Sequence, residues 1–98
     1  KITAIAWDYI EDEGGSFPVI RSMGEIAGTT AVLIAAELMS NANEGKGLML
    51  GGVAGITPPE MVIIGAGTVG QFAASAAISL GVSVKVFDKI LEMQLKYR

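Results

Sequence analysis

The sequence contains no cysteine and no histidine among its 98 residues. Without cysteine it forms no disulfide framework and offers no thiolate zinc site. Without histidine it holds no Ser-His-Asp triad, no histidine metal cluster and no histidine acid–base catalyst. These kinds of catalytic and metal site are therefore excluded from this chain.

Charged residues are also scarce, at 17% of the chain, and the formal net charge is −3. A nucleic-acid binder needs a basic face, so nucleic acid is not an expected partner. Hydrophobic residues make up 51% of the sequence, which excludes intrinsic disorder. A domain of this size buries only about 60–65% of its unfolded surface. So much apolar surface indicates a piece of a larger subunit or an obligate homo-oligomer.

Long apolar runs are absent as well. A bilayer span needs about 20 apolar residues, whereas the run Thr29–Ala36 stops at Glu37 and Phe72–Val82 is interrupted by serine and glycine. No signal-peptide core follows Lys1. We expect no membrane insertion and, with neither cysteine nor an export signal, a cytoplasmic location.

The first twenty residues predict a strand and a turn. Alternation of β-forming residues over Ile2–Trp7 indicates a strand, and the charged, glycine-rich segment Glu11–Ser16 indicates an exposed turn. Residues Phe17–Ile20 are predicted to be extended, because Pro18 disfavours helix at the residue before it.

A long helix should follow. Ser22 and Glu25 have the spacing of a capping box, so the helix is predicted to begin there and to run to Met39 or Ser40. Its apolar residues cover most of its circumference, which is typical of a helix buried on several sides. Turn-forming residues over Asn41–Gly47 end it.

The second half predicts a strand–helix–strand unit, and hence an α/β fold. The unit is a Rossmann-like βαβ with parallel strands, preceded by the long helix as an interdomain crossing. After a connector over Leu48–Pro59, we expect a strand at Glu60–Ile64 and a helix at Thr68–Leu80. Gly81 should form the left-handed cap of this helix, followed by a second strand at Val82–Phe87 and a last helix at Lys89–Tyr97.

A glycine pattern lies between these two strands. Gly65, Gly67 and Gly70 are separated by Ala66 and by the pair Thr68 and Val69. Such a pattern is weak alone, but here a strand precedes it, a helix opens on it and a second strand follows, as a dinucleotide site requires.

Each residue of the pattern has a physical task in such a site. Gly65 permits the tight turn, Gly67 lets the backbone approach a diphosphate, and Gly70 lets the helix pack close to the strand. The amides of Thr68 and Val69 are free at the helix N-terminus, where the helix dipole also favours an anion.

Asp88 completes the predicted site. It follows Gly65 by 23 positions, near the spacing of about 20 expected for the acid that binds the ribose. A carboxylate there repels a 2′-phosphate, so NAD(H) is favoured over NADP(H), although Lys89 stands beside it. Three alternatives stay open: FAD, S-adenosylmethionine, or a turn that binds nothing.

Two further groups of residues are candidates for an anion site or a metal site. Arg21, just before the predicted helix, either faces an anion or is solvated. The acidic residues near the N-terminus are better explained as an exposed turn than as a metal site, because they lack a calcium-loop pattern; they are Asp8, Glu11, Asp12 and Glu13.

Three blocks of the chain resemble the alanine dehydrogenase and pyridine nucleotide transhydrogenase alpha-subunit family. Residues 22–28 resemble the family's helix start, residues 45–55 its glycine-rich connector, and residues 63–88 its nucleotide fingerprint. The resemblance covers Ile2–Asp88, and the first two blocks are more specific than the fingerprint.

The resemblance implies a two-lobed subunit, with one lobe for an amino or keto acid and a Rossmann lobe for NAD. Residues 1–20 would end the substrate lobe with a strand and turn, residues 21–47 would form the interdomain helix and turn, and residues 48–98 would start the NAD-binding domain. The family's catalytic lysine and histidine would precede this chain, so the 98 residues alone should show no turnover.

The implied activity is that of an NAD-dependent oxidoreductase of the alanine dehydrogenase type, which converts L-alanine, water and NAD⁺ to pyruvate, ammonium and NADH. Leu50–Val53 favours this branch of the family, whereas Ile56–Pro59 leans toward the transhydrogenase alpha subunit. A non-catalytic NAD-binding regulatory module is a third hypothesis, supported by the lack of histidine. The chain departs from the family pattern at Gly24, where a serine often contacts NAD, and at Ala54 and Met93.

Overall fold

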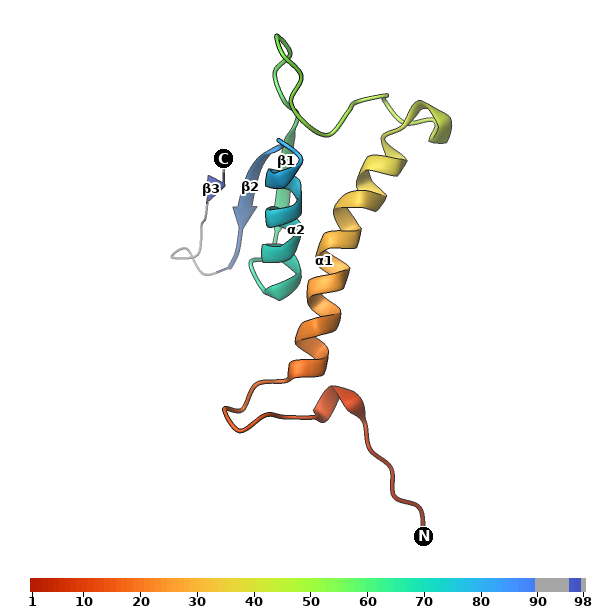
Figure 1. The fold of residues 1–98 in the computed structure, drawn as a ribbon, viewed down its shortest axis with the longest axis vertical. Coiled ribbons are helices and arrows are strands. Elements are labelled where there is room, and N and C mark those ends of the chain that lie inside the picture. Colours follow the sequence, from red (N-terminus) through yellow and green to blue (C-terminus); the bar gives the residue numbers. More distant parts are fainter. Residues whose placement is uncertain (90–95, 98) are drawn as a thin grey trace.

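Two parallel strands joined by a helix form the centre of the molecule, and a longer helix lies alongside (Figure 1). The computed structural model describes residues 1–89 and 96–97. The elements, in chain order, are η1 (Trp7–Tyr9), α1 (Pro18–Leu38), η2 (Asn41–Asn43), β1 (Glu60–Ile64), α2 (Thr68–Ser79), β2 (Ser83–Phe87) and β3 (Lys96–Tyr97). This order confirms the predicted α/β class.

The sheet has the strand order β1-β2-β3. Strands β1 and β2 are parallel, in a register that runs from Glu60 opposite Ser83 to Ile64 opposite Phe87. Strand β3 pairs with β2 in the antiparallel sense. Because β1 and β2 are parallel and aligned, their carboxyl ends meet at one edge of the sheet.

Small residues fill the core between the sheet and α2. The alternate valines of the second strand segment, Val82, Val84 and Val86, are buried against Ala73, Ala74 and Ala77 of α2. Alternation puts the three valines on one face of the strand. Alanines at this spacing lie on one face of the helix and allow it to come close to the sheet.

The turn between β1 and α2 brings backbone against backbone. Gly65 has a φ of +108°, which favours glycine. A Cβ at Gly70 would overlap the carbonyl oxygen of Gly65 and lie 3.6 Å from Ile63. The first turn of α2 therefore rests on the end of β1 with no side chain between them.

Helix α1 packs against α2 through a second close approach. A Cβ at Gly28 would overlap the Val69 carbonyl and lie 2.9 Å from both the Ala73 nitrogen and the Phe72 Cβ. Val32, one turn further along α1, is buried in the core. The α1–α2 contact thus fixes the N-terminal half of α2 against α1.

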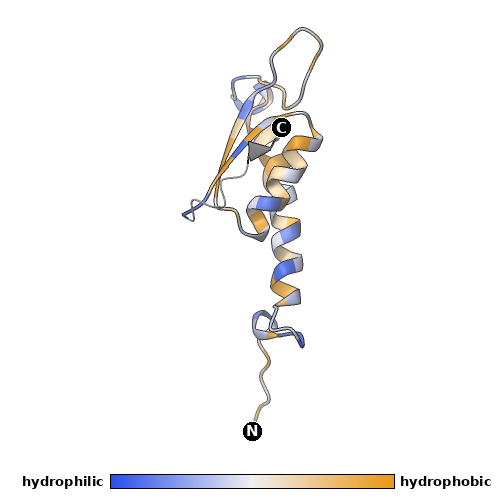
Figure 2. Cartoon of the chain, turned by 90° about the vertical axis from the view of Figure 1, so that its left-hand side faces the viewer, coloured by the Kyte–Doolittle hydropathy of each residue, from blue (hydrophilic) through white to orange (hydrophobic). Residues whose placement is uncertain are grey.

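Most of α1 is exposed, which differs from the expected burial on several sides. Figure 2 shows apolar residues along much of its length. On the far face of β1, Val62 and Ile64 are 54% and 89% exposed. The radius of gyration is 17.0 Å, against about 13 Å for a compact domain of this length. The exposed apolar residues of α1 are Ile20, Met23, Ile26, Leu33, Ile34 and Leu38.

By length and composition α1 could also cross a membrane, and in the described part of the chain it is the one helix that could. A single helix of this kind is weak evidence, because core helices meet the same criteria. Its contact with α2 through Gly28 is the packing of a helix within a protein.

Three predictions of secondary structure in the first half are wrong. Residues 2–6 form no strand, because a strand needs a neighbour and none of the described segments pairs with them; Trp7 begins η1 instead. Helix α1 begins at Pro18, where proline is favoured in the first turn, so the segment Phe17–Ile20, predicted to be extended, is helical from Pro18 onward. The capping box is not formed, since Ser22 lies inside the helix and its Oγ donates to the Pro18 carbonyl at 2.9 Å.

The later boundaries agree closely with the prediction. Helix α2, strands β1 and β2 and the left-handed Gly81, with a φ of +90°, lie within a residue of their predicted positions. The helix expected over Lys89–Tyr97 lies largely outside the described residues. The backbone of Lys96–Tyr97 pairs with β2 as strand, so helix is wrong for these two residues.

The α1–α2 contact predicts that Gly28→Ala destabilises the protein. Alanine gains up to about 1 kcal/mol of helix propensity, but overpacking against fixed backbone costs about 1–3 kcal/mol. Thermal unfolding of the full protein should show a lower Tm. Gly24→Ala is the matched control, because its Cβ would meet only side-chain atoms of α2, the nearest at 3.3 Å. Equal Tm values for the two variants would contradict this packing account.

The β1–α2 turn predicts that alanine destabilises the protein at one of its glycines and is tolerated at another. Gly70→Ala should lower the free energy of unfolding by about 2 kcal/mol or more, because the new methyl group meets the Gly65 carbonyl. Gly67→Ala should leave it within about 0.5 kcal/mol of the parent, since no atom lies within 4 Å of its Cβ position. Chemical denaturation of both variants measures the difference, and a tolerated Gly70→Ala would show that the helix does not rest on the strand.

Candidate functional site

The glycine turn lies at the carboxyl ends of the two parallel strands. Strand β1 ends at Ile64 and α2 begins at Thr68. The Gly65 nitrogen donates to the Phe87 carbonyl at 2.6 Å, which extends the pairing of β1 and β2 by one residue. In open parallel sheets, ligands bind at this edge.

Asp88 lies against the turn. Its Oδ2 accepts a hydrogen bond from the Ala66 nitrogen at 2.6 Å, and Ala66 is 1% exposed. The bond joins residues 22 positions apart in the sequence. The spacing argument that placed Asp88 beside Gly65 and Gly67 is therefore supported in space, while the binding of a ribose by this carboxylate stays a prediction.

The N-terminus of α2 is open at the turn. Gly67 is the N-cap residue, no side chain caps the helix, and its first turn contains no acidic residue. The amides of Thr68 and Val69 have no hydrogen-bond acceptor within the part of the chain that the structure describes. The helix dipole adds positive potential at this end. The arrangement suits an anion held by backbone amides.

Gln71 is a site residue that the sequence argument missed. Its side-chain nitrogen Nε2 donates to the Ala66 carbonyl at 2.8 Å. The available signal was a lone amide side chain in the second turn of a helix that is otherwise apolar or small. The glycine pattern itself does not specify that position.

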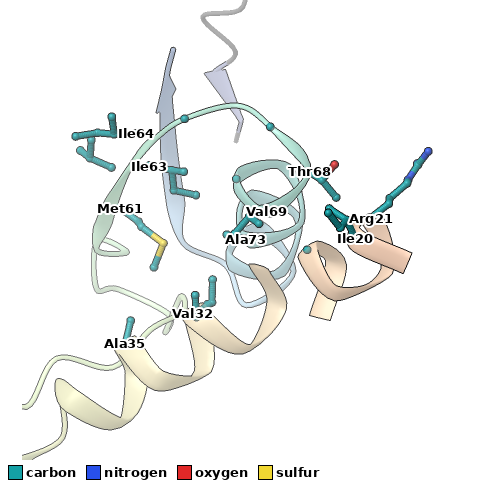
Figure 3. Close-up of a pocket in the computed structure, with 16 residues that line it drawn as sticks. Ile20, Arg21, Val32, Ala35, Met61, Ile63, Ile64, Thr68, Val69 and Ala73 are labelled. Atoms are coloured by element: carbon teal, nitrogen blue, oxygen red, sulfur yellow. The ribbon is translucent and has the colours of Figure 1, made fainter. Parts of the chain in front are cut away.

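A cavity of about 510 Å³ opens beside the turn, between α1, β1 and α2. Figure 3 shows Thr68 and Arg21 close together at one end and Val32 and Ala35 of α1 at the other. Met61 and Ile63 of β1 also line it, so most of its wall is apolar.

A second hollow, of about 360 Å³, lies where the two strands end. It is lined by Ile64, Gly65, Phe87, Asp88 and Lys89. The Asp88 carboxylate is therefore at the wall of a concave surface that adjoins the turn.

Arg21 stands at the rim of the larger cavity. Its Nε lies 3.3 Å from Glu25 Oε1, and the Arg21 side chain is 67% exposed. Figure 3 shows its guanidinium extending away from the other lining residues. Of the two interpretations of Arg21, this geometry favours a solvated side chain paired along the helix.

The acidic turn near the N-terminus is held by its own backbone. Asp12 Oδ1 accepts from the nitrogens of Gly14 and Ser16, each at 2.9 Å. In the described ranges, no three histidine, cysteine or acidic side chains are grouped so that they would hold a metal ion.

The turn fits a dinucleotide in three respects. The space at the Gly67 Cβ position is open to 4 Å, the neighbouring amides of α2 have no acceptor among the described residues, and the Asp88 carboxylate faces the same turn. A diphosphate needs the first two features and a ribose diol needs the third. These residues are the ones that would hold NAD.

Known proteins resemble the chain over most of its length. The family model described as alanine dehydrogenase/PNT, C-terminal domain, matches residues 31–97. The alanine dehydrogenase of Methanococcus maripaludis is 40% identical over 88 residues, which cover 90% of this chain and 24% of that protein. The alanine dehydrogenase of Mycobacterium tuberculosis is 37% identical over 86 residues, covering 88% of this chain and 23% of that protein.

A solved structure agrees with these sequence relatives. An L-alanine dehydrogenase structure superposes with a TM-score of 0.81 at 39% identity and covers 90% of this chain and 24% of that one. The chain thus spans about a quarter of the length of the relatives that it matches. The family model and the relatives agree with the family that the three sequence blocks resembled, and the chain belongs to the alanine dehydrogenase/PNT family.

Proposed function

We propose that this chain is the NAD(H)-binding part of an alanine dehydrogenase, an enzyme that oxidises L-alanine to pyruvate and ammonium. The observation that carries the proposal is the contact between Asp88 and the glycine turn, with Asp88 Oδ2 at 2.6 Å from the Ala66 nitrogen. The amides that would donate to a diphosphate and the carboxylate that would accept from a ribose then adjoin one another at the end of a parallel sheet. The relatives named above, all alanine dehydrogenases, support the substrate.

In this proposal the chain binds and orients the cofactor. The amides of Gly67, Thr68 and Val69 bind the diphosphate, and the Asp88 carboxylate accepts from the ribose hydroxyls. Bound NAD⁺ supplies the hydride acceptor of the reaction. The remaining groups that act on the amino acid are proposed to belong to the substrate lobe.

The same proposal assigns the segments of the chain. Residues 1–20 end the substrate lobe, residues 21–47 cross between lobes, and residues 48–98 begin the NAD-binding domain. The exposed apolar face of α1 supports a role between lobes or between subunits of a homo-oligomer.

The second candidate is the alpha subunit of a transhydrogenase, which passes a hydride from NADH toward NADP⁺. The matching family model does not separate it from the first candidate, because that model is described for both branches, alanine dehydrogenase and PNT. Alanine-dependent reduction of NAD⁺ by the full protein separates the two, since a transhydrogenase subunit would show none.

Gly67→Val should abolish NADH binding with little effect on folding. The valine side chain fills the open space over the turn, which is where the diphosphate would lie. Titration of NADH fluorescence with the full protein should show a loss of at least about tenfold in affinity, equivalent to about 1.4 kcal/mol. The Tm should stay close to that of the parent, and undiminished binding would contradict the proposed site.

Asp88→Asn should narrow the preference for NAD⁺ over NADP⁺. The asparagine carbonyl oxygen can still accept from the Ala66 amide, but the negative charge that repels a 2′-phosphate is lost. We expect KM for NAD⁺ to rise about tenfold, as for the loss of a charged hydrogen bond. The matched control is Glu60→Gln, which removes one carboxylate at the opposite end of β1. An unchanged cofactor ratio in Asp88→Asn would remove Asp88 from the site.

A further inference from the structure

We propose that Gln71 is a positioning residue that directs the Gly67 amide toward the diphosphate of the bound dinucleotide. The inference rests on the proposed function, because it concerns how the same turn becomes ready to bind. Gln71 lies outside the glycine pattern, in the second turn of α2. Its role depends on the hydrogen bonds of one residue, Ala66.

Ala66 is held from both sides. Its N–H donates to Asp88 Oδ2 at 2.6 Å, and its carbonyl accepts from Gln71 Nε2 at 2.8 Å. Ala66 itself is 1% exposed. The two consecutive peptide groups that meet at this residue are therefore each fixed by a different side chain, one from the end of β2 and one from α2.

The bond from Gln71 determines where the next amide points. In a trans peptide the carbonyl and the N–H lie on opposite sides of the C–N bond, and the described chain has no cis peptide. With the Ala66 carbonyl turned toward Gln71, the N–H of Gly67 points away from Gln71. Gly67 lines the larger cavity and has no atom within 4 Å of its Cβ position, so the turn is open to a ligand at this residue.

Gln71 also binds the following carbonyl. Its backbone nitrogen donates to Gly67 O at 2.9 Å, as the first hydrogen bond of α2. One residue thus fixes two successive carbonyls, those of Ala66 and Gly67, on the helix side of the turn. The N–H groups of Gly67 and Thr68 are left for a ligand on the other side of the turn.

A glycine turn needs such a constraint more than other turns do. Gly65 and Gly67 lack the Cβ that restricts backbone rotation, and ordering a free peptide on binding costs affinity. A side chain that holds the peptide in place before the ligand arrives removes part of that cost. The effect concerns the diphosphate and leaves the ribose contact of Asp88 unchanged.

The test uses Gln71→Met, which keeps the length and helix propensity of the side chain and removes its donor. The displacement of bound NADH from the full protein by ADP-ribose, and by adenosine, which lacks the diphosphate, would be followed by NADH fluorescence. We expect affinity for ADP-ribose to fall about fivefold, as for one hydrogen bond, and affinity for adenosine to stay unchanged. Gln71→Asn, whose amide is too short to reach Ala66, should behave like Gln71→Met.

Ser75→Met is the matched control, because it puts the same side chain on an exposed position one helical turn further from the site. It should leave both affinities unchanged. Equal losses for ADP-ribose and adenosine in Gln71→Met would indicate general loosening and would overturn the positioning role. If the parent protein binds NADH and Gln71→Met leaves both affinities unchanged, the positioning role would also be overturned. A parent protein that binds no NADH would instead refute the proposed function, and the inference with it.

Discussion

The contact of α2 with the end of β1 is the constraint on which the rest depends. At this point the Gly65 carbonyl occupies the space that a side chain at Gly70 would need, so two backbones meet directly. The contact fixes the direction of α2 and leaves its N-terminal amides at the end of the sheet. The parallel register then places Asp88, one residue beyond β2, beside the turn. Fold and candidate site therefore follow from the same close approach.

A second close approach supports the first. Gly28 of α1 meets the backbone of α2 near Val69 and Ala73, so α2 is held by α1 as well as by the sheet. Elsewhere α1 and the far face of β1 expose large apolar side chains. In relatives of which this chain covers about a quarter, there is chain to cover such faces. The extended dimensions and the exposed apolar surface are thus consistent with a segment whose partners lie elsewhere in the protein.

The sequence predicted those features whose signals are local. Apolar β-branched runs marked β1 and β2, the glycines marked the turn, and Gly81 marked the end of α2. Features that depend on distant partners were not predictable. The strand expected at Ile2–Trp7 has alternating residues but no described neighbour. The start of α1 is different, because two local signals competed and Pro18 starts the helix earlier than the capping box at Ser22 would. The Gln71 bond depends on where a backbone carbonyl turns, which no pattern of residue types encodes.

The N-terminus of α2 can bind a ligand only because other groups keep its amides open and hold their direction. The glycines remove side chains, and the hydrogen bonds that Ala66 donates to Asp88 and accepts from Gln71 hold the peptides between them. The most direct test is a crystal structure of the full protein with NAD⁺. The account predicts diphosphate oxygens within hydrogen-bond distance of the Gly67–Val69 amides and the adenosine ribose on Asp88. A diphosphate bound away from this turn, or a ribose that does not contact Asp88, would contradict it.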